Sequence, residues 1–228
     1  AHGVLELDPS AFATLQPGAF GASGNAVVVA AGTGLGVAGL YWDGSRHRPF
    51  ASEGGHVGFG PETEQELELL RFMRERHGRV SWERVASGSA FADLLAFMEG
   101  WRGLKPGAAA ADRLAAGEDA GVVVSSEAKA GGCELCAETL QLFVRLYGRH
   151  AGNLVLDHKA TGGLYLGGGI PPKILDWLRG PDFLEALADK GRMRPLVESV
   201  PVRVVLDDRV PLHGAARVAR ATCPAERE

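Results

Sequence analysis

The sequence predicts a mixed α/β fold, and three observations lead to that prediction. Short apolar runs punctuated by glycine and turn residues crowd into residues 26–51. Helical apolar patterns then dominate residues 63–156, and a strand followed by helices appears from residue 163 onward. Strands first, then helices, then strand–helix units are typical of a mixed sheet flanked by helices.

The early part of the chain is expected to form three strands. Residues 26–30 and 36–42 are β-branched or glycine-containing apolar runs, joined by the loop 31–36. A weaker run at 46–51 follows the Asp43-Gly44 turn signal, as in a hairpin. We therefore expect an antiparallel start to the sheet.

A first amphipathic helix is predicted over residues 63–77. Glu and Arg alternate there around Leu67, Leu70 and Phe72, as on a solvated helix. Thr63 and Glu66 have the spacing of a capping box at its start.

A long buried helix is predicted over residues 134–156, and shorter elements surround it. Leu135, Leu142, Leu146 and Leu154 fall on its apolar side. The other expected elements are a helix start at 81–84, a helix at 89–98, a loop at 103–107, alanine-rich helical segments to about 130, strands at 163–166 and 202–206, and helices at 172–178, 183–189 and 212–220.

Composition limits the class of protein. The 228 residues are 46% hydrophobic, which is enough to bury a substantial core. The net charge of -4 gives no basic field that would attract nucleic acid or an anionic membrane. No apolar run approaches the ~20 residues needed to span a bilayer. The 3 cysteines are too few for a disulfide framework, so we expect the reducing cytosol.

Cys133 and Cys136 have the spacing of a redox or zinc site. A single such pair does not make a zinc site, and this one stands at the head of a helical segment, where buried structural cysteines are common. We expect the two side chains to serve packing, with thiol-redox chemistry as the alternative.

The glycine-rich loop between the first two strands is a candidate anion site. Glycine permits a sharp turn that leaves N–H groups free, and Thr33 adds a donor. No Gly-Lys-Ser/Thr follows, and a strand rather than a helix comes next, so the loop is neither a Walker loop nor a dinucleotide fingerprint. A glycine-rich hairpin without a ligand is the alternative.

Two further polar or glycine-rich clusters could contact ligands. Glu53 and His56 flank two glycines after a strand, and such a pair can hydrogen-bond neighbouring hydroxyls, although a polar turn is the simpler interpretation. Three glycines at 167–169, between a strand and a helix, exceed what a turn needs and would let a flat ligand lie on backbone. Glu83, by contrast, has the ordinary position of a first-turn helix carboxylate.

Five segments in chain order carry a family resemblance. They are AGTGLG at 31–36, EGGHV at 53–57, SWERVASG at 81–88, GGLYLGGGI at 162–170 and DKGRM at 189–193. Together they resemble the bacterial glucokinases of the actin/hexokinase/Hsp70-like ATPase superfamily, over nearly the whole chain. The resemblance implies a ribonuclease H-like (actin-like ATPase) large domain, with a mixed sheet flanked by helices. The Cys cluster of the related zinc-binding group has no counterpart here.

The resemblance assigns roles to the clusters. In that family the positions matching Glu53, His56 and Glu83 bind sugar hydroxyls. The loop matching Gly32, Thr33, Gly34, Leu35 and Gly36 contacts ATP phosphate, and the one matching Gly167, Gly168, Gly169 and Ile170 lies against adenosine. The implied reaction is phosphoryl transfer from ATP to the 6-hydroxyl of glucose, with Mg²⁺ on the phosphates. A homodimer is expected from the family.

The resemblance also implies that part of the family pattern is missing. We expect residues 1–228 to form the large C-terminal domain, without the N-terminal small lobe and its Asp-Ile-Gly-Gly-Thr-like phosphate loop. In the family an Asn-Asp-Phe-like motif, whose Asp is the catalytic base, should precede residue 1. Residues 1–7 resemble the end of a helix already under way, so we also expect upstream sequence to be missing. Asp8 and Asp43 lie in sequence contexts that do not match this motif, so we do not expect either of them to replace the base. We therefore expect this chain alone to be nearly or wholly inactive.

A second hypothesis comes from a different class of protein. Without a base and a complete phosphate site, the chain would be a non-catalytic sugar-binding module or regulator, which holds glucose and does not phosphorylate it.

Overall fold

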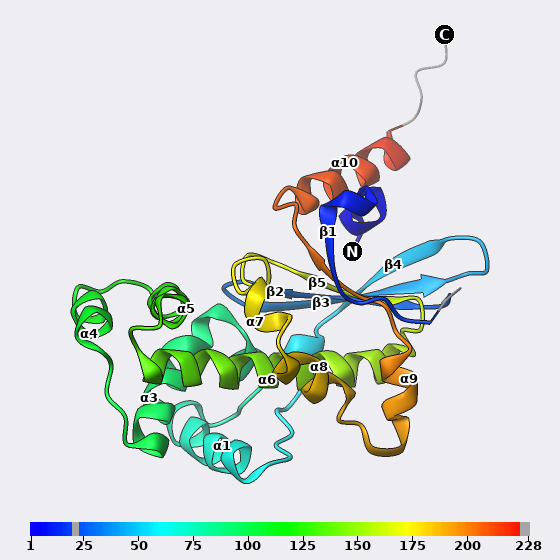
Figure 1. Cartoon of the computed structure of the whole chain (residues 1–228). Helices are drawn as coiled ribbons and strands as arrows, with labels where there is room; N and C mark the ends of the chain where they lie inside the picture. The colour runs from blue at the N-terminus through cyan, green and yellow to red at the C-terminus, as the bar shows by residue number, and fades with distance from the viewer. Residues whose placement is uncertain (20–22, 224–228) are drawn as a thin grey trace.

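The computed structural model describes residues 1–19 and 23–223, and a six-stranded mixed sheet forms its centre (Figure 1). The strands lie in the order β1-β6-β5-β2-β3-β4. Their bounds are Phe12–Gln16 for β1, Ala26–Ala31 for β2, Leu35–Trp42 for β3, His47–Ser52 for β4, Gly163–Gly167 for β5 and Val202–Val205 for β6. The predicted mixed sheet flanked by helices is confirmed.

β2 occupies the middle of the sheet and joins its two halves. It pairs in parallel with β5 and antiparallel with β3, so the expected antiparallel start is confirmed. Its β-branched residues suit a strand that is covered on both faces. Val27 and Val29 face the main core, whereas Val28 belongs to a smaller cluster on the opposite face.

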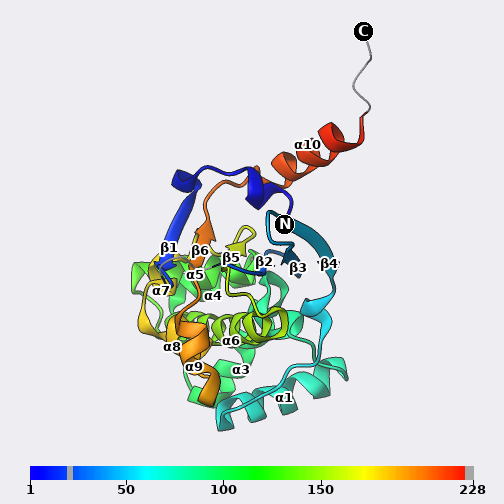
Figure 2. The same cartoon turned by 90° about the vertical axis from the view of Figure 1, so that its right-hand side faces the viewer.

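Helices cover one face of the sheet, with α6 running along it (Figures 1 and 2). The α-helices of the described residues, including α10 on the opposite face, have these bounds: α1 Glu64–His77, α2 Glu83–Ala86, α3 Phe91–Arg102, α4 Ala108–Ala115, α5 Ala120–Ala130, α6 Glu134–His158, α7 Leu175–Leu178, α8 Pro181–Ala188, α9 Arg194–Glu198 and α10 Val210–Thr222. The four leucines predicted for the apolar side of α6 are all buried.

The backbones of α6 and α8 approach each other closely at two glycines of α6. A Cβ atom on Gly148 would lie 2.4 Å from the carbonyl oxygen of Phe183, and one on Gly152 would lie 2.3 Å from that of Leu187. Both distances are far inside van der Waals contact. The two glycines therefore allow α8 to pack directly on the α6 backbone.

α1 begins as predicted, and Leu70 and Phe72 of its predicted apolar side pack, partly buried, against the main core. Thr63 and Glu66 form both hydrogen bonds of the capping box. The buried side chains are Glu66, Leu69 and Met73, whereas Leu67 is 40% exposed. Glu66 lies in the interior because its Oε1 accepts a hydrogen bond of 2.9 Å from Nε of the buried Arg149.

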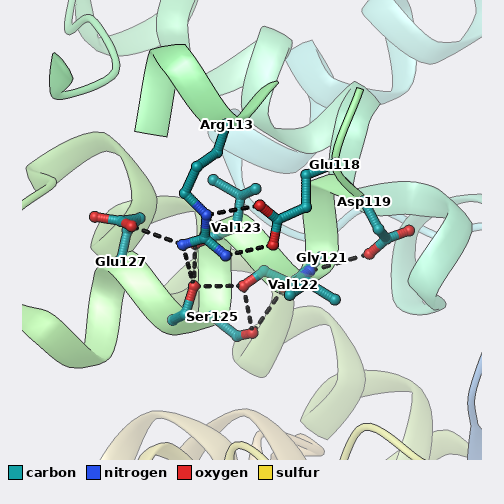
Figure 3. A network of polar contacts seen from close by, with 9 residues as sticks. Arg113, Glu118, Asp119, Gly121, Val122, Val123, Ser125 and Glu127 are labelled. Carbon is teal, nitrogen blue, oxygen red and sulfur yellow. Dashed lines mark hydrogen bonds and ion pairs between the residues drawn. The ribbon is translucent and has the colours of Figure 1, made fainter. Parts of the chain in front are cut away.

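A polar network fixes the corner between α4 and α5 (Figure 3). Arg113 Nη1 donates to Glu127 Oε1 over 2.7 Å, and Arg113 Nε donates to Glu118 Oε2 over 2.8 Å. These hydrogen bonds to carboxylates raise the pKa of Arg113. Asp119 caps α5 by accepting from the N–H of Val122.

The opposite face of the sheet carries the 3₁₀ helix η1 (Gly3–Glu6) and α10 (Figure 2). Val4 and Val205 join Ala26, Val28 and Leu40 there in a small buried cluster. Residues 1–7, predicted as the end of a helix, thus contain one 3₁₀ turn.

Several other predictions need correction. β1 and α9 were not predicted, and the helix expected over 172–178 is reduced to the four residues of α7. Cys133 and Cys136 are buried, as packing requires, but they are also joined by a disulfide across the first turn of α6, which the sequence did not predict. The bridge closes a very short loop, so it constrains the chain little. Among the described residues, none of the helices has the length and apolar character to cross a membrane.

Candidate active site

The predicted sugar-binding residues lie together where β4 ends. His56 stands between the other two, with Nε2 at 3.8 Å from Glu53 Oε2 and Nδ1 at 3.8 Å from Glu83 Oε1. These distances exceed those of hydrogen bonds, so the imidazole and the facing carboxylate oxygens remain able to bind hydroxyls. Glu53 is 90% exposed at its side chain, and Glu83 is 29% exposed.

The two halves of this cluster come from segments that are tied together by backbone contacts. Gly58 and Ser81 form an isolated β-bridge, and the N–H of Trp82 donates to the carbonyl of Val57 over 3.0 Å. Glu83 follows directly as the first residue of α2. Its first-turn position was predicted, but its carboxylate reaches away from the helix and accepts from the N–H of Leu35 over 2.9 Å.

The loop between β2 and β3 has the features of a phosphate cradle. The N–H of Gly32 donates to the carbonyl of Gly34 over 2.9 Å. Within the described residues, the N–H groups of Thr33 and Gly34 donate to no protein acceptor. A tight turn with free N–H groups is suited to an anion. The predicted strand–loop–strand context is confirmed.

The second glycine-rich loop lies on the first. Gly168 has φ +88, and a Cβ there would lie 2.2 Å from the carbonyl oxygen of Ala31. That same oxygen accepts from the N–H of Ile170 over 3.1 Å. Gly168 is therefore required both by its left-handed backbone and by the close approach of β2. The helix expected directly after these glycines begins only at Leu175 and has four residues.

A cavity of about 1210 Å³ opens beside this second loop. Gly167, Gly168 and Gly169 line it together with Ala30 and Lys173, and η1 and α10 form its far side. Its volume is sufficient for a ligand the size of a nucleotide.

The two aspartates considered as substitutes for the family base have other roles or surroundings. Asp43 accepts hydrogen bonds from the N–H groups of Ser45 and Arg46 and from Nε of Arg48, which lowers its pKa. These hydrogen bonds hold the Asp43 carboxylate in the turn between β3 and β4. Asp8 is an exposed residue ahead of a short 3₁₀ helix.

Metal ligands do not gather in the part of the chain that the structure describes. Residues 1–19 and 23–223 contain no group of three or more His, Cys, Asp or Glu side chains placed to hold a metal ion.

The sequence did not reveal the residues that hold the loop between β2 and β3 by hydrogen bonds. Gly88 donates its N–H to the carbonyl of Gly32 over 2.7 Å, and Ser89 donates to that of Thr33 over 3.2 Å. Gly88 belongs to the matching segment SWERVASG, but its role depends on a contact between residues far apart in the chain, and no local pattern reveals such a contact.

Comparison with known proteins gives one family. The family model described as Glucokinase matches residues 1–222. A glucokinase of Trichormus variabilis is 38% identical over 233 residues, covering 96% of this chain and 67% of its own length. A glucokinase of Marinobacter nauticus is 41% identical over 190 residues, covering 83% of this chain and 56% of its own length.

A solved structure agrees with these relatives. The crystal structure of glucokinase from an Antarctic psychrotroph superposes with a TM-score of 0.83 at 33% identity, covering 97% of this chain and 66% of that one. The chain thus spans about two thirds or less of the length of the relatives it matches. On the family model and these relatives, the chain belongs to the glucokinase family.

Proposed function

We propose that this chain provides the sugar- and nucleotide-binding part of an ATP-dependent glucokinase, which converts glucose and ATP to glucose 6-phosphate and ADP. The observation that carries the proposal is the meeting of two sites at Leu35. Its N–H group donates to Glu83 of the sugar cluster, and as the first residue of β3 it directly follows Thr33 and Gly34, whose N–H groups are free for phosphate within the described residues. Relatives at 36–41% identity that are glucokinases support the same activity.

Each cluster has a defined task in the proposed reaction. Glu53 and Glu83 accept hydrogen bonds from sugar hydroxyls, and His56 between them can donate or accept. Thr33 and Gly34 hold phosphate through backbone N–H groups that donate to no acceptor among the described residues, whereas Leu35 and Gly36, also predicted to contact phosphate, lie in β3. Gly167–Ile170 provides a flat backbone surface beside the cavity for adenosine. Mg²⁺ bound to the phosphates would neutralise charge during transfer. In such transfers, positioning and electrostatics supply most of the rate enhancement.

The rate of the isolated chain should be limited by removal of the proton from the 6-hydroxyl of glucose. Asp43 is held in its turn, and the three sugar-cluster side chains are proposed as sugar ligands. A missing general base typically costs ~10²–10⁴ in rate. We therefore predict binding of both substrates by the 228 residues, with little or no turnover. The alternative of a pure sugar-binding regulator is not favoured, since the family model and relatives are glucokinases.

The test combines turnover and binding. A coupled glucose 6-phosphate assay with glucose, ATP and Mg²⁺ should give no more than a trace rate, and calorimetry of the same sample should show glucose binding. Robust turnover would mean that a carboxylate among residues 1–228 acts as the base. Absence of both turnover and glucose binding would contradict the proposed function.

The sugar ligands are tested by one conservative substitution. Glu53→Gln should weaken glucose binding by about 1–3 kcal/mol, because an unpaired polar partner is left in the complex. Glu75→Gln, an exposed carboxylate on α1, is the matched control and should leave the glucose affinity unchanged. Equal glucose affinity in both variants would remove Glu53 from the site.

Two predictions about context remain part of the proposal. The family resemblance favours a homodimer, which light scattering of the purified chain would test. The small number of cysteines favours the cytosol, whereas the Cys133–Cys136 disulfide is a feature that the reducing cytosol disfavours, and fractionation of cells would decide between them.

A further inference from the structure

Three segments of the proposed site meet at Leu35, which is 4% exposed. Its N–H group donates to Glu83 Oε2 over 2.9 Å. Its carbonyl oxygen faces the turn of the sugar cluster so closely that a Cβ on Gly55 would lie 2.1 Å away. The phosphate loop is therefore in direct contact with both sugar-binding segments.

The segment 83–89 supports the nucleotide loops at further points. The N–H groups of Gly88 and Ser89 donate to carbonyls of the phosphate loop. A Cβ on Gly88 would lie 2.7 Å from the carbonyl oxygen of Gly32 and 3.5 Å from Cδ1 of Ile170. Gly88 thus lies where the phosphate loop and the adenosine loop come together, and there is no space there for a side chain.

Glu83 has one carboxylate oxygen toward each ligand site. Oε1 faces His56 at 3.8 Å, on the sugar side, and Oε2 holds the Leu35 N–H. A sugar hydroxyl that binds Oε1 would restrict the carboxylate to the orientation in which Oε2 accepts from Leu35. Sugar binding would then reduce the freedom of the phosphate loop before the nucleotide arrives.

We infer that the segment 83–89 couples sugar binding to nucleotide binding, and that Gly88 is a positioning residue for both nucleotide loops. The inference rests on the proposed function, since it assumes that the two sites take sugar and nucleotide. Because coupling is reciprocal, each ligand should tighten the binding of the other by the same factor.

The experiment measures the glucose affinity of the full chain by calorimetry, with and without saturating AMPPNP, and the AMPPNP affinity with and without glucose. In the native sequence, AMPPNP should lower the Kd for glucose by roughly 5–150-fold, the usual range of such coupling. In Gly88→Ala, the Kd for glucose alone should stay within about two-fold, while nucleotide affinity and coupling fall by about ten-fold or more, since the new Cβ displaces the Gly32 carbonyl.

A second variant acts without straining the backbone support. A Cβ on Gly34 would meet Glu83 Oε2 at 2.7 Å, so Gly34→Ala should push this carboxylate off the Leu35 N–H and abolish the coupling in a folded protein. Gly100→Ala, where a Cβ on α3 would meet nothing within 4 Å, is the matched control and should keep the coupling of the native sequence. If Gly88→Ala does not fold, Gly34→Ala decides.

The outcomes separate this inference from the proposed function. If the native chain binds neither glucose nor AMPPNP, the proposed function fails and the coupling with it. If it binds both without coupling, or if Gly34→Ala retains native coupling, the inference alone fails. If Gly88 serves only the stability of the fold, Gly88→Ala should lower the melting temperature and weaken the binding of glucose and AMPPNP by the same factor. That result would also overturn the inference.

Discussion

His150 lies in the interior of the protein against Trp82, the residue before Glu83. It is 1% exposed, and its ring stacks on Trp82, with ring centroids 4.8 Å apart. Within the described residues, neither ring nitrogen has a hydrogen-bond partner. Burial, with a smaller contribution from the nearby Lys190, lowers the pKa of His150 to about 3. The imidazole is therefore neutral in the native state at neutral pH.

This burial predicts a loss of stability in mild acid. A histidine in the unfolded chain has its ordinary pKa of 6.5 and takes up a proton below that pH, whereas native His150 does not until about pH 3. The free energy of unfolding should be unaffected above pH 6.5 and fall between these limits, by at most about 1.4 kcal/mol per pH unit from this residue. Urea unfolding at several pH values should show a shallower decline in His150→Phe.

A control separates this residue from general acid effects. His2 is exposed, so His2→Gln should follow the decline of the native sequence. If His150→Phe declines as steeply as His2→Gln, the uptake of protons between pH 6.5 and 3 comes from other groups.

Replacing a glycine by alanine should lower the free energy of unfolding in α6 and raise it in α3. Gly152→Ala forces a Cβ to within 2.3 Å of the Leu187 carbonyl, so the α6–α8 contact should open at a cost of about 1–3 kcal/mol. Gly100→Ala meets nothing within 4 Å and should stabilise by about 0.4–1 kcal/mol through the unfolded state. Denaturant unfolding measures both, and stabilisation by Gly152→Ala would contradict the close packing.

The start of α1 should depend on one carboxylate. Glu66 is 3% exposed, closes the capping box and pairs with Arg149, which is 5% exposed. Glu66→Ala removes one partner of a buried ion pair, a change that typically lowers the free energy of unfolding by about 3–5 kcal/mol. We expect the lower end of this range, because Arg149 keeps its ion pairs with Glu62 and Asp189. Glu75→Ala, exposed on the same helix, should change stability by less than about 0.5 kcal/mol. Equal effects of the two variants on the urea midpoint would be contrary to this account.

The elements predicted well from the sequence are those with a local signal. The three early strands were placed within one residue of β2, β3 and β4, because β-branched runs and the Asp43-Gly44 turn are local features. The capping box at Thr63 is likewise local. β1 was missed because its partner β6 lies near the other end of the chain, and a five-residue edge strand carries little pattern of its own.

Burial of polar groups could not be predicted. The buried side of α1 was predicted only in part: Leu70 and Phe72 pack against the main core, but Leu67 is exposed, and Arg149, from another helix, holds Glu66 in the interior. The burial of His150 likewise depends on a contact between distant residues, its stacking on Trp82, and no local pattern indicates such a contact. In the candidate site, Glu53 and His56 were visible as a polar cluster, whereas Glu83 was selected only by family resemblance, since its link to Leu35 spans 48 positions.

For the molecule as a whole, the two faces of the sheet differ in how firmly they are covered. The main core continues through α6 and its neighbours, whereas η1 and α10 rest on the small cluster around Val4 and Val205, and Gly214 is the buried residue of α10. Regions with few buried apolar contacts open at lower free energy than the global unfolding.

This difference predicts separate opening. In hydrogen–deuterium exchange, peptides from α10 should exchange well before those from β2 and α6. Val4→Ala should accelerate exchange in α10 much more than in β2, because β2 is also held by the main core through Val27 and Val29. Equal protection of α10 and α6 would show that the chain opens as one cooperative unit.

The pairing of β1 with β6 has a mechanical consequence. Phe12 opens β1 opposite Val205, which closes β6, and the N–H of Leu206 donates to the carbonyl of Ala11 over 2.8 Å. The η1–α10 layer is thus tethered to the sheet by two straps that run side by side. Because the two connections run side by side, η1 and α10 join the sheet at one edge, and the layer that forms the far side of the cavity beside Gly168 depends on that single pair of strands for its covalent link to the sheet.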